Sequence, residues 1–132
     1  MFCQQGIDIV EIQRISKIYE KFGFNFLVKI LSKEELKIIP INKKRRIDFI
    51  SGRFAVKEAF VKALGTGFRN EWSLKKISVL NNSSGRPEIL FENSINELLK
   101  KRIKNINILV SIAHEKNYCV ASVMIIGEKK ET

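Results

Sequence analysis

Asp8 is a carboxylate in a segment whose other residues favour burial. Residues 6–10 are Gly, Ile, Asp, Ile and Val, a pattern typical of a short strand. A buried carboxylate must contact a cation, a metal ion or hydrogen-bond donors, because its desolvation is otherwise too costly. Asp8 is therefore part of a binding site, or one half of a salt bridge to a lysine, or the cap of a helix that starts near Glu11.

Lys57, Glu58 and Lys62 are the only charged residues between positions 54 and 64. The rest of this stretch is apolar nearly all round the predicted helix, and such helices are usually buried. One explanation is an ion pair between Glu58 and Lys62, four residues apart, which stabilises a helix by about 0.2–0.5 kcal/mol. That gain does not offset the burial of three charges, so a functional site explains them better.

Two carboxylates, Asp8 and Glu58, together with nearby lysines have the chemistry of a site for a divalent cation and a phosphate. Carboxylate oxygens suit Mg²⁺ and also Mn²⁺, and lysine ammonium groups bind phosphate. The Gly65-Thr66-Gly67 segment would let backbone N–H groups approach a phosphate, although a glycine also commonly ends a helix. The sequence has no Cys/His cluster at zinc spacing, no Walker-type phosphate loop and no nucleophile elbow.

The charge balance predicts an acidic partner. The 132 residues hold 24 Lys and Arg against 14 Asp and Glu, a formal net charge of +10. Arg14, Lys17 and Lys21 recur at helical spacing and form a basic ridge, which is either a docking surface or a solvated face. With the basic run at residues 43–46, they leave a second class open, a small nucleic-acid-binding module. Against that class, the aromatic residues fall at core spacing and the two carboxylates stay unexplained.

The length and the order of the elements predict one compact α+β domain over residues 1–132, with helices packed on one face of an antiparallel sheet. Ser-x-x-Glu capping boxes at residues 32–35 and 94–97 mark two helix starts. His114, the only histidine, falls in the connection between the last two strands. Strands are expected at residues 6–10, 77–79, 88–91, 106–112 and 118–126, and helices at 12–22, 33–39, 48–64 and 94–103.

Cysteine usage and hydropathy predict a soluble, cytoplasmic protein. Cys3 and Cys119 have no CxxC partner and no flanking histidine, so both are expected to be small apolar fillers. The first residues lack the pattern of a secretory signal. No uninterrupted apolar run approaches the roughly 18 residues that a membrane span needs.

Two signatures occur in the chain. The first is Gly6-Ile7-Asp8-Ile9-Val10-Glu11, and the second is Arg53-Phe54-Ala55-Val56-Lys57-Glu58-Ala59-Phe60-Val61-Lys62-Ala63-Leu64-Gly65-Thr66-Gly67. In this order they resemble the holo-(acyl-carrier-protein) synthases, the short 4'-phosphopantetheinyl transferases. The resemblance extends to Arg14, to Gly85-x-Pro87 and to Ser111-x-x-His114, so it covers almost the whole chain. The joint occurrence is specific, whereas each half alone is weak.

The resemblance implies transfer of the 4'-phosphopantetheine arm of coenzyme A to a serine of an apo acyl carrier protein, for fatty acid biosynthesis, with release of adenosine 3',5'-bisphosphate. It implies that Asp8 and Glu58 bind Mg²⁺ and that Lys62 meets the pyrophosphate, so these three are the catalytic candidates. Attack of the serine hydroxyl on phosphorus needs charge neutralisation, alignment and removal of one proton. The residues leave open whether a metal-bound water or one of the carboxylates takes that proton.

The same resemblance assigns the other coenzyme A contacts. Arg53 and His114 match positions near the adenosine and its 3'-phosphate, and Lys57 is a further candidate. Gly65 would allow close backbone approach, and Gly85-x-Pro87 would border the adenine.

The partners and the assembly also follow from the resemblance. Arg14, Lys21 and Arg45 match basic positions that dock the acidic helix of the carrier protein, and family members are usually homotrimers with sites between subunits. No membrane or nucleic-acid partner is expected. The chain departs from the family pattern at Ala113, where many relatives have serine, and in an apparent insertion around residues 93–107.

Overall fold

The structure is a computed structural model that describes residues 1–65 and 73–130. Strands begin and end the described chain, and most of the helices lie in its first half. The elements are, in chain order, β1 (Phe2–Glu11), α1 (Ile12–Phe22), α2 (Phe24–Ile30), α3 (Lys33–Lys37), α4 (Lys43–Leu64), the short 3-10 helix η2 (Leu74–Lys76), β2 (Ile77–Asn81), β3 (Pro87–Phe91), α5 (Asn93–Arg102), β4 (Ile103–His114) and β5 (Tyr118–Lys129).

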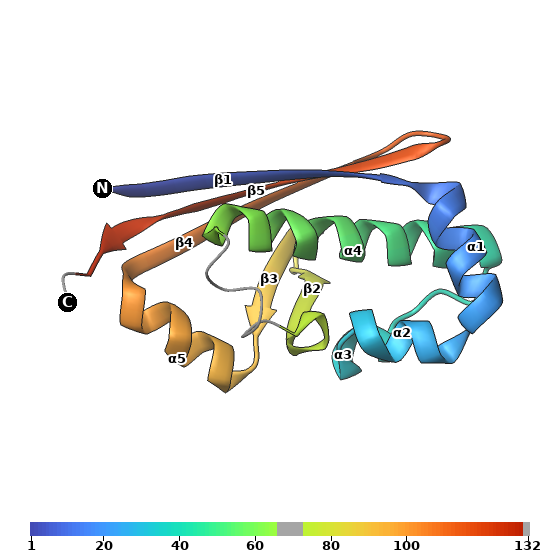
Figure 1. Cartoon of the computed structure of the whole chain (residues 1–132), viewed down its shortest axis with the longest axis horizontal. Coiled ribbons are helices and arrows are strands. Elements are labelled where there is room, and N and C mark those ends of the chain that lie inside the picture. Colours follow the sequence, from blue (N-terminus) through green and yellow to red (C-terminus); the bar gives the residue numbers. More distant parts are fainter. Residues whose placement is uncertain (66–72, 131–132) are drawn as a thin grey trace.

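Strands β1, β5 and β4 form an antiparallel sheet with β5 in the middle. Alternate residues of β5 from Cys119 to Ile125 are fully buried, as expected for a strand with one face on the core. Figure 1 shows the helices together on one side of this sheet. The predicted α+β arrangement, an antiparallel sheet with helices on one face, is confirmed.

Helix α4 packs against the inner face of the sheet and supplies much of the core. It begins at Lys43, because the Asn42 side chain caps it by accepting a hydrogen bond from the Arg45 N–H at 3.0 Å. The prediction that this helix starts at Asp48 was therefore wrong by more than one turn. The basic run, unfavourable near a helix N-terminus, concealed the true start.

The hairpin β2–β3 packs on the side of α4 away from the sheet (Figure 1). The rings of Phe60 on α4 and Phe91 on β3 meet with their centroids 5.1 Å apart. Helix α4 is thus covered by the sheet on one side and by the hairpin on the other. This explains why its sequence is apolar nearly all round.

Local capping signals gave one correct and one incorrect prediction. The capping box at residues 32–35 is present, since the Glu35 N–H donates to Ser32 Oγ at 3.2 Å and the Ser32 N–H donates to Glu35 Oε1 at 2.9 Å. The box predicted at residues 94–97 is absent, because α5 begins at Asn93 after Glu92 and has no side-chain cap. Helix α2 was not predicted at all.

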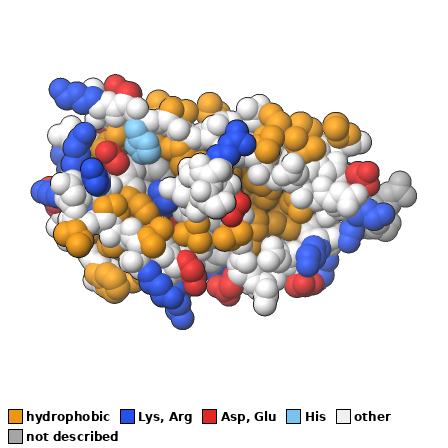
Figure 2. Space-filling view, turned by 180° about the vertical axis from the view of Figure 1, so that it is seen from behind, with side chains coloured by type: hydrophobic (Ala, Val, Ile, Leu, Met, Phe, Trp, Pro, Cys, Tyr) orange, Lys and Arg blue, Asp and Glu red, His pale blue; other side chains and the backbone are white. Residues whose placement is uncertain are grey.

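The outer face of the three-stranded sheet is apolar and exposed. Ile7 and Ile9 of β1 are 60% and 63% exposed, and Leu109 of β4 is 49% exposed. Seen from behind, hydrophobic side chains gather along the upper edge of the molecule, where this sheet lies (Figure 2). In the described residues, no helix is both long and apolar enough to cross a membrane.

Candidate functional site

Strand β1 crosses α4 so closely at Gly6 that no other residue fits there. A Cβ at this position would lie 1.9 Å from the Ala59 carbonyl oxygen and 2.7 Å from the Ala63 nitrogen. Because strand side chains alternate between faces, Asp8 points to the same inner side as Gly6, and its neighbours Ile7 and Ile9 point outward. The two-residue spacing of Gly6 and Asp8 thus places a carboxylate beside α4.

Asp8 forms an ion pair with Lys62 from the last turn of α4. The Lys62 ammonium donates to Asp8 Oδ1 at 2.9 Å and to the Ile7 carbonyl at 3.2 Å. The Asp8 side chain is 15% exposed and that of Lys62 is 47% exposed. The embedded carboxylate therefore has the cation that its burial requires, and the lysine still faces solvent, where a phosphate would reach it.

Asp8 and Glu58 line the same pocket. The pocket has a volume of about 510 Å³ and also contains Arg14 of α1. Its apolar wall includes Phe54 from α4 and Tyr118 from β5. Residues from two paired strands, β1 and β5, and from three helices, α1, α2 and α4, thus meet around a pair of carboxylates.

The pocket fits a magnesium ion only if the substrate completes its coordination. In the described ranges 1–65 and 73–130, no three His, Cys, Asp or Glu side chains gather closely enough to form an all-protein metal site. Mg²⁺ is commonly held by one or two carboxylates together with substrate phosphates and water. Asp8 and Glu58, as two hard oxygen donors beside the phosphate-binding candidate Lys62, match that pattern.

Arg53 lies on the opposite side of α4 from Lys62. The two residues are nine positions apart, about 2.5 turns of an α-helix, so their side chains point in opposite directions. The Arg53 Nε donates to the Val79 carbonyl at 3.2 Å, and its guanidinium stacks 3.9 Å above the centroid of the Phe49 ring. Burial lowers the pKa of Arg53 from its usual value, while the charge of Glu35 acts against that shift.

The sequence placed His114 in the connection between the last two strands. In the structure it is the last residue of β4. Its Nε2 lies 3.1 Å from the Asp48 carbonyl oxygen of α4. A Cβ on Gly52 would come within 3.3 Å of the imidazole, so this glycine lets the ring lie against α4. His114 is exposed, and its ring lies against the stretch of α4 that carries Arg53.

Gly85 and Pro87 lie in the turn and at the start of β3 in the hairpin. Gly85 has φ of 85°, a left-handed conformation that favours glycine, and its N–H donates to the Asn82 carbonyl. Pro87 and Arg86 line a pocket of about 600 Å³ between the hairpin and β4, with Ser111 on its other wall. The structure therefore brings the Gly85-x-Pro87 and Ser111-x-x-His114 segments to neighbouring strands.

Gly65 ends α4 with φ of 94°, and its N–H donates to the Val61 and Lys62 carbonyls at 3.2 Å. A Cβ there would meet no atom within 4 Å, so the backbone at Gly65 is open to approach. The rest of the predicted glycine segment, Thr66 and Gly67, lies outside the described residues.

Lys57 is fully buried, and the structure disagrees with its assignment to coenzyme A binding. Its ammonium donates to the Ile30 carbonyl at 2.7 Å, to the Leu74 carbonyl at 3.0 Å and to Glu35 Oε1. A lysine ammonium has three N–H groups, and these three acceptors use all of them. Burial lowers the pKa of Lys57 to about 8 even though Glu35 favours its charged form. No pattern in the sequence indicated Glu35 as the partner of Lys57.

The predicted basic ridge is exposed along α1. Arg14, Lys17 and Lys21 all face solvent, and Arg45 is exposed in the first turn of α4. Arg46, by contrast, turns inward and donates to the Pro40 carbonyl at 2.9 Å and to the Tyr19 hydroxyl at 3.2 Å. The basic run at 43–46 is therefore not a continuous surface for a nucleic acid.

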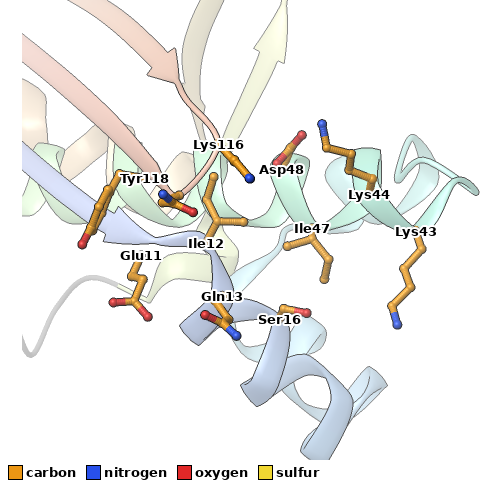
Figure 3. Close-up of a pocket in the computed structure, with 11 residues that line it drawn as sticks. Glu11, Ile12, Gln13, Ser16, Lys43, Lys44, Ile47, Asp48, Lys116 and Tyr118 are labelled. Carbon is orange, nitrogen blue, oxygen red and sulfur yellow. The ribbon is translucent and has the colours of Figure 1, made fainter.

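A further pocket, of about 710 Å³, lies where the starts of α1 and α4 meet the β4–β5 turn. Figure 3 shows Asp48, Lys44 and Lys116 on one side of it and Glu11 with Tyr118 on the other. Sequence reasoning did not identify this pocket, because its walls come from three segments that are far apart in the chain.

The chain is similar to known proteins over nearly its whole length. The family model described as the 4'-phosphopantetheinyl transferase superfamily matches residues 4–123. A holo-(acyl-carrier-protein) synthase of Chloroherpeton thalassium is 39% identical over 126 residues, which cover 96% of this chain and 99% of that protein.

Two solved structures share the fold. The holo-(acyl-carrier-protein) synthase of Neisseria meningitidis has a TM-score of 0.84 at 33% identity and covers 93% of this chain and 97% of its own. The synthase of Helicobacter pylori, determined in complex with coenzyme A, has a TM-score of 0.75 at 31% identity and covers 92% of this chain and 99% of its own.

Proposed function

This chain belongs to the 4'-phosphopantetheinyl transferase superfamily, and we propose that it transfers the 4'-phosphopantetheine arm of coenzyme A to a serine of an apo acyl carrier protein. The products are holo acyl carrier protein, for fatty acid biosynthesis, and adenosine 3',5'-bisphosphate. The observation that carries this proposal is the pocket that joins Asp8 and Glu58, with Lys62 paired to Asp8 at its edge.

Asp8 and Glu58 are the proposed ligands of Mg²⁺, with Mn²⁺ as an acceptable substitute. When bound, the cation would neutralise charge on the pyrophosphate of coenzyme A. Lys62 is half exposed beside Asp8, so its ammonium would hold a pyrophosphate oxygen and stabilise the charge that develops there. A carboxylate of the pocket would accept the proton of the attacking serine hydroxyl.

The direct test is to mix the protein with coenzyme A, Mg²⁺ and an apo acyl carrier protein and to measure the mass of the carrier. We expect one added phosphopantetheinyl group, lost on chelation of the metal and in Asp8→Asn or Glu58→Gln protein that keeps its circular dichroism spectrum. No mass gain with the wild-type chain, while a control synthase modifies the same carrier, would contradict the proposal.

We further propose a homotrimer with sites between subunits. Lys62 and Arg53 point to opposite sides of α4, so one chain does not present both to a single coenzyme A molecule. The exposed apolar face formed by Ile7, Ile9 and Leu109 is the type of surface that a second copy covers. A neighbouring subunit would then supply Arg53, His114 and the hairpin turn opposite Asp8, Glu58 and Lys62.

Mixed oligomers test this arrangement. At a coenzyme A concentration well below the KM, Lys62→Met and Arg53→Met proteins are each expected to lose most of their activity. Oligomers refolded from both would regain it, because some interfaces combine an intact Lys62 with an intact Arg53. Activity that stays at the level of the single variants would contradict shared sites. Light scattering on the wild-type chain gives the number of subunits independently.

The carrier protein is proposed to dock on Arg14, Lys21 and Arg45, which are all exposed. Opposite charges steer association and set specificity more than they raise affinity. Arg14→Glu should therefore raise the KM for the carrier protein and leave the KM for coenzyme A unchanged. An equal rise in both constants would place Arg14 in the coenzyme A site instead, since Arg14 also lines the carboxylate pocket.

A further inference from the structure

Two side chains bind the free edge of strand β2 at Val79. The Val79 N–H donates to Glu35 Oε2 at 2.8 Å, and the Val79 carbonyl accepts a hydrogen bond from Arg53 Nε at 3.2 Å. Val79 is fully buried and pairs with Ile89 on the other side of the strand. Buried edge groups need partners, so Glu35 and Arg53 together do here what a neighbouring strand would do.

Glu35 is itself fixed from two directions. Its Oε1 accepts hydrogen bonds from Lys57 Nζ and from the Ser32 N–H of the capping box. The side chains of Glu35 and Lys57 are both fully buried. The ammonium of Lys57 also holds the Ile30 and Leu74 carbonyls, at the end of α2 and in η2. Glu35 thus has little freedom to move.

These contacts form a closed circuit that starts and ends on α4. Lys57 and Arg53 are four residues apart and therefore lie on the same face of the helix, one turn from each other. The circuit runs from Lys57 to Glu35, from Glu35 to the Val79 N–H, and from the Val79 carbonyl to Arg53. The Arg53 Nε donates to the Val79 carbonyl, and the guanidinium stacks on the Phe49 ring. The position of Val79 therefore sets the direction of the guanidinium.

We propose that Glu35 and Lys57 are positioning residues for coenzyme A, which hold Val79 in place and thereby direct the Arg53 guanidinium toward the 3'-phosphate of the nucleotide. The inference rests on the proposed function and on the family resemblance, which places Arg53 near that phosphate. It gives the buried pair a role in recognising one end of the donor, distinct from the phosphoryl transfer at Asp8 and Glu58.

The test compares coenzyme A with 3'-dephospho-coenzyme A as donors for the same apo carrier protein. In Glu35→Gln protein, the amide cannot accept from both Lys57 and Val79, so Val79 and Arg53 lose their fixed position. We expect about a tenfold rise in the KM for coenzyme A, an unchanged KM for the dephospho donor and similar kcat values. A purely structural defect would lower the active fraction, and hence kcat, equally with both donors.

Four further variants complete the experiment. Arg53→Met should abolish the preference for coenzyme A, and adding Glu35→Gln to it should change the preference no further, because Glu35 acts through Arg53. Glu20→Gln breaks the exposed Lys43–Glu20 pair and should leave both KM values as in the wild type. Lys57→Arg keeps the positive charge but loses the three hydrogen bonds that Lys57 Nζ makes. If the Glu35→Gln protein does not fold, Lys57→Arg takes its place and should give the same KM values.

The outcomes separate the two proposals. A wild-type preference for coenzyme A in Glu35→Gln and in Lys57→Arg would overturn the positioning role. Equal KM values of the wild-type chain for both donors would overturn the assignment of Arg53 and the inference with it. A wild-type chain that modifies the carrier with neither donor would overturn the proposed function instead.

Discussion

Two lysines near the end of helix α4 meet carboxylates in contrasting surroundings. Lys57 pairs with Glu35 where both side chains are fully buried, whereas Lys62 pairs with Asp8 where the lysine is 47% exposed and the aspartate 15%. The ammonium of Lys57 also holds two backbone carbonyls, and that of Lys62 holds one. These lysines are only five positions apart, yet one pair is closed to solvent and the other is open.

The difference shows which lysine is available to a ligand. A buried ion pair is strongly disrupted when one partner is removed, because the other charge is left without compensation in a medium of low polarity. A partly exposed pair exchanges its partner for water or a phosphate at little cost. The pair at Glu35 is therefore suited to fixing α4, α3 and β2 together, and the pair at Asp8 to chemistry.

Lys57→Met gives the sharpest test of the buried pair. The free energy of unfolding should fall by about 3–5 kcal/mol, because Glu35 would remain as an unpaired buried charge. Urea denaturation followed by circular dichroism measures this change. Adding Glu35→Gln to Lys57→Met should cost less than the two single changes summed, since the uncompensated charge is then removed.

The exposed Lys43–Glu20 pair provides the matched control. Its N–O distance is 3.5 Å and its side chains are 72% and 58% exposed, so Lys43→Met should change the free energy of unfolding by less than about 1 kcal/mol. Similar losses in Lys43→Met and Lys57→Met would show that burial does not distinguish the two kinds of pair.

The sequence identified both residues of the open pair, Asp8 and Lys62. Of the closed pair it identified Lys57 but not its partner Glu35. Asp8 and Lys62 were noticeable because each is a charge in an apolar segment, and the structure brings them together. Lys57 was noticed for the same reason, but Glu35 lies in a short polar helix where a glutamate is ordinary. A contact between two elements that are distant in the chain leaves no local pattern.

The fold was predicted where periodicity and turn residues act locally, and missed where tertiary contacts decide. The strands and their antiparallel arrangement were expected, whereas α2 has no side-chain cap and depends on packing through Leu27 and Ile30. The burial of β1 was also misjudged, because Ile7 and Ile9 turn out to face outward. An apolar residue on a strand does not reveal whether its own chain or another one covers it.

Lys62→Met examines the open pair. Turnover should fall roughly 100-fold, which corresponds to about 2.7 kcal/mol of transition-state stabilisation, because a cation at the pyrophosphate is lost. The free energy of unfolding should change by less than about 1 kcal/mol, since the lysine is half exposed. Carrier modification rates and urea denaturation measure the two effects, and Lys75→Met, at an exposed position of η2, serves as the control. A large loss of stability with normal turnover would assign Lys62 the role we give to Lys57.

Gly6→Ala examines how the open pair is placed, and its expected effect is the smallest of the three. A Cβ at Gly6 would overlap the Ala59 carbonyl oxygen, so β1 must move away from α4, and overpacking of this kind costs about 1–3 kcal/mol. Asp8 lies two residues further along the same strand face and would move with it, so turnover should fall together with stability. Gln5→Ala, exposed on the outer face of β1, should change the free energy of unfolding by less than about 0.5 kcal/mol. If Gly6→Ala lowered stability but left turnover intact, the distance between Asp8 and Lys62 would not depend on the close contact of β1 with α4, and the open pair would owe its geometry to another part of the strand.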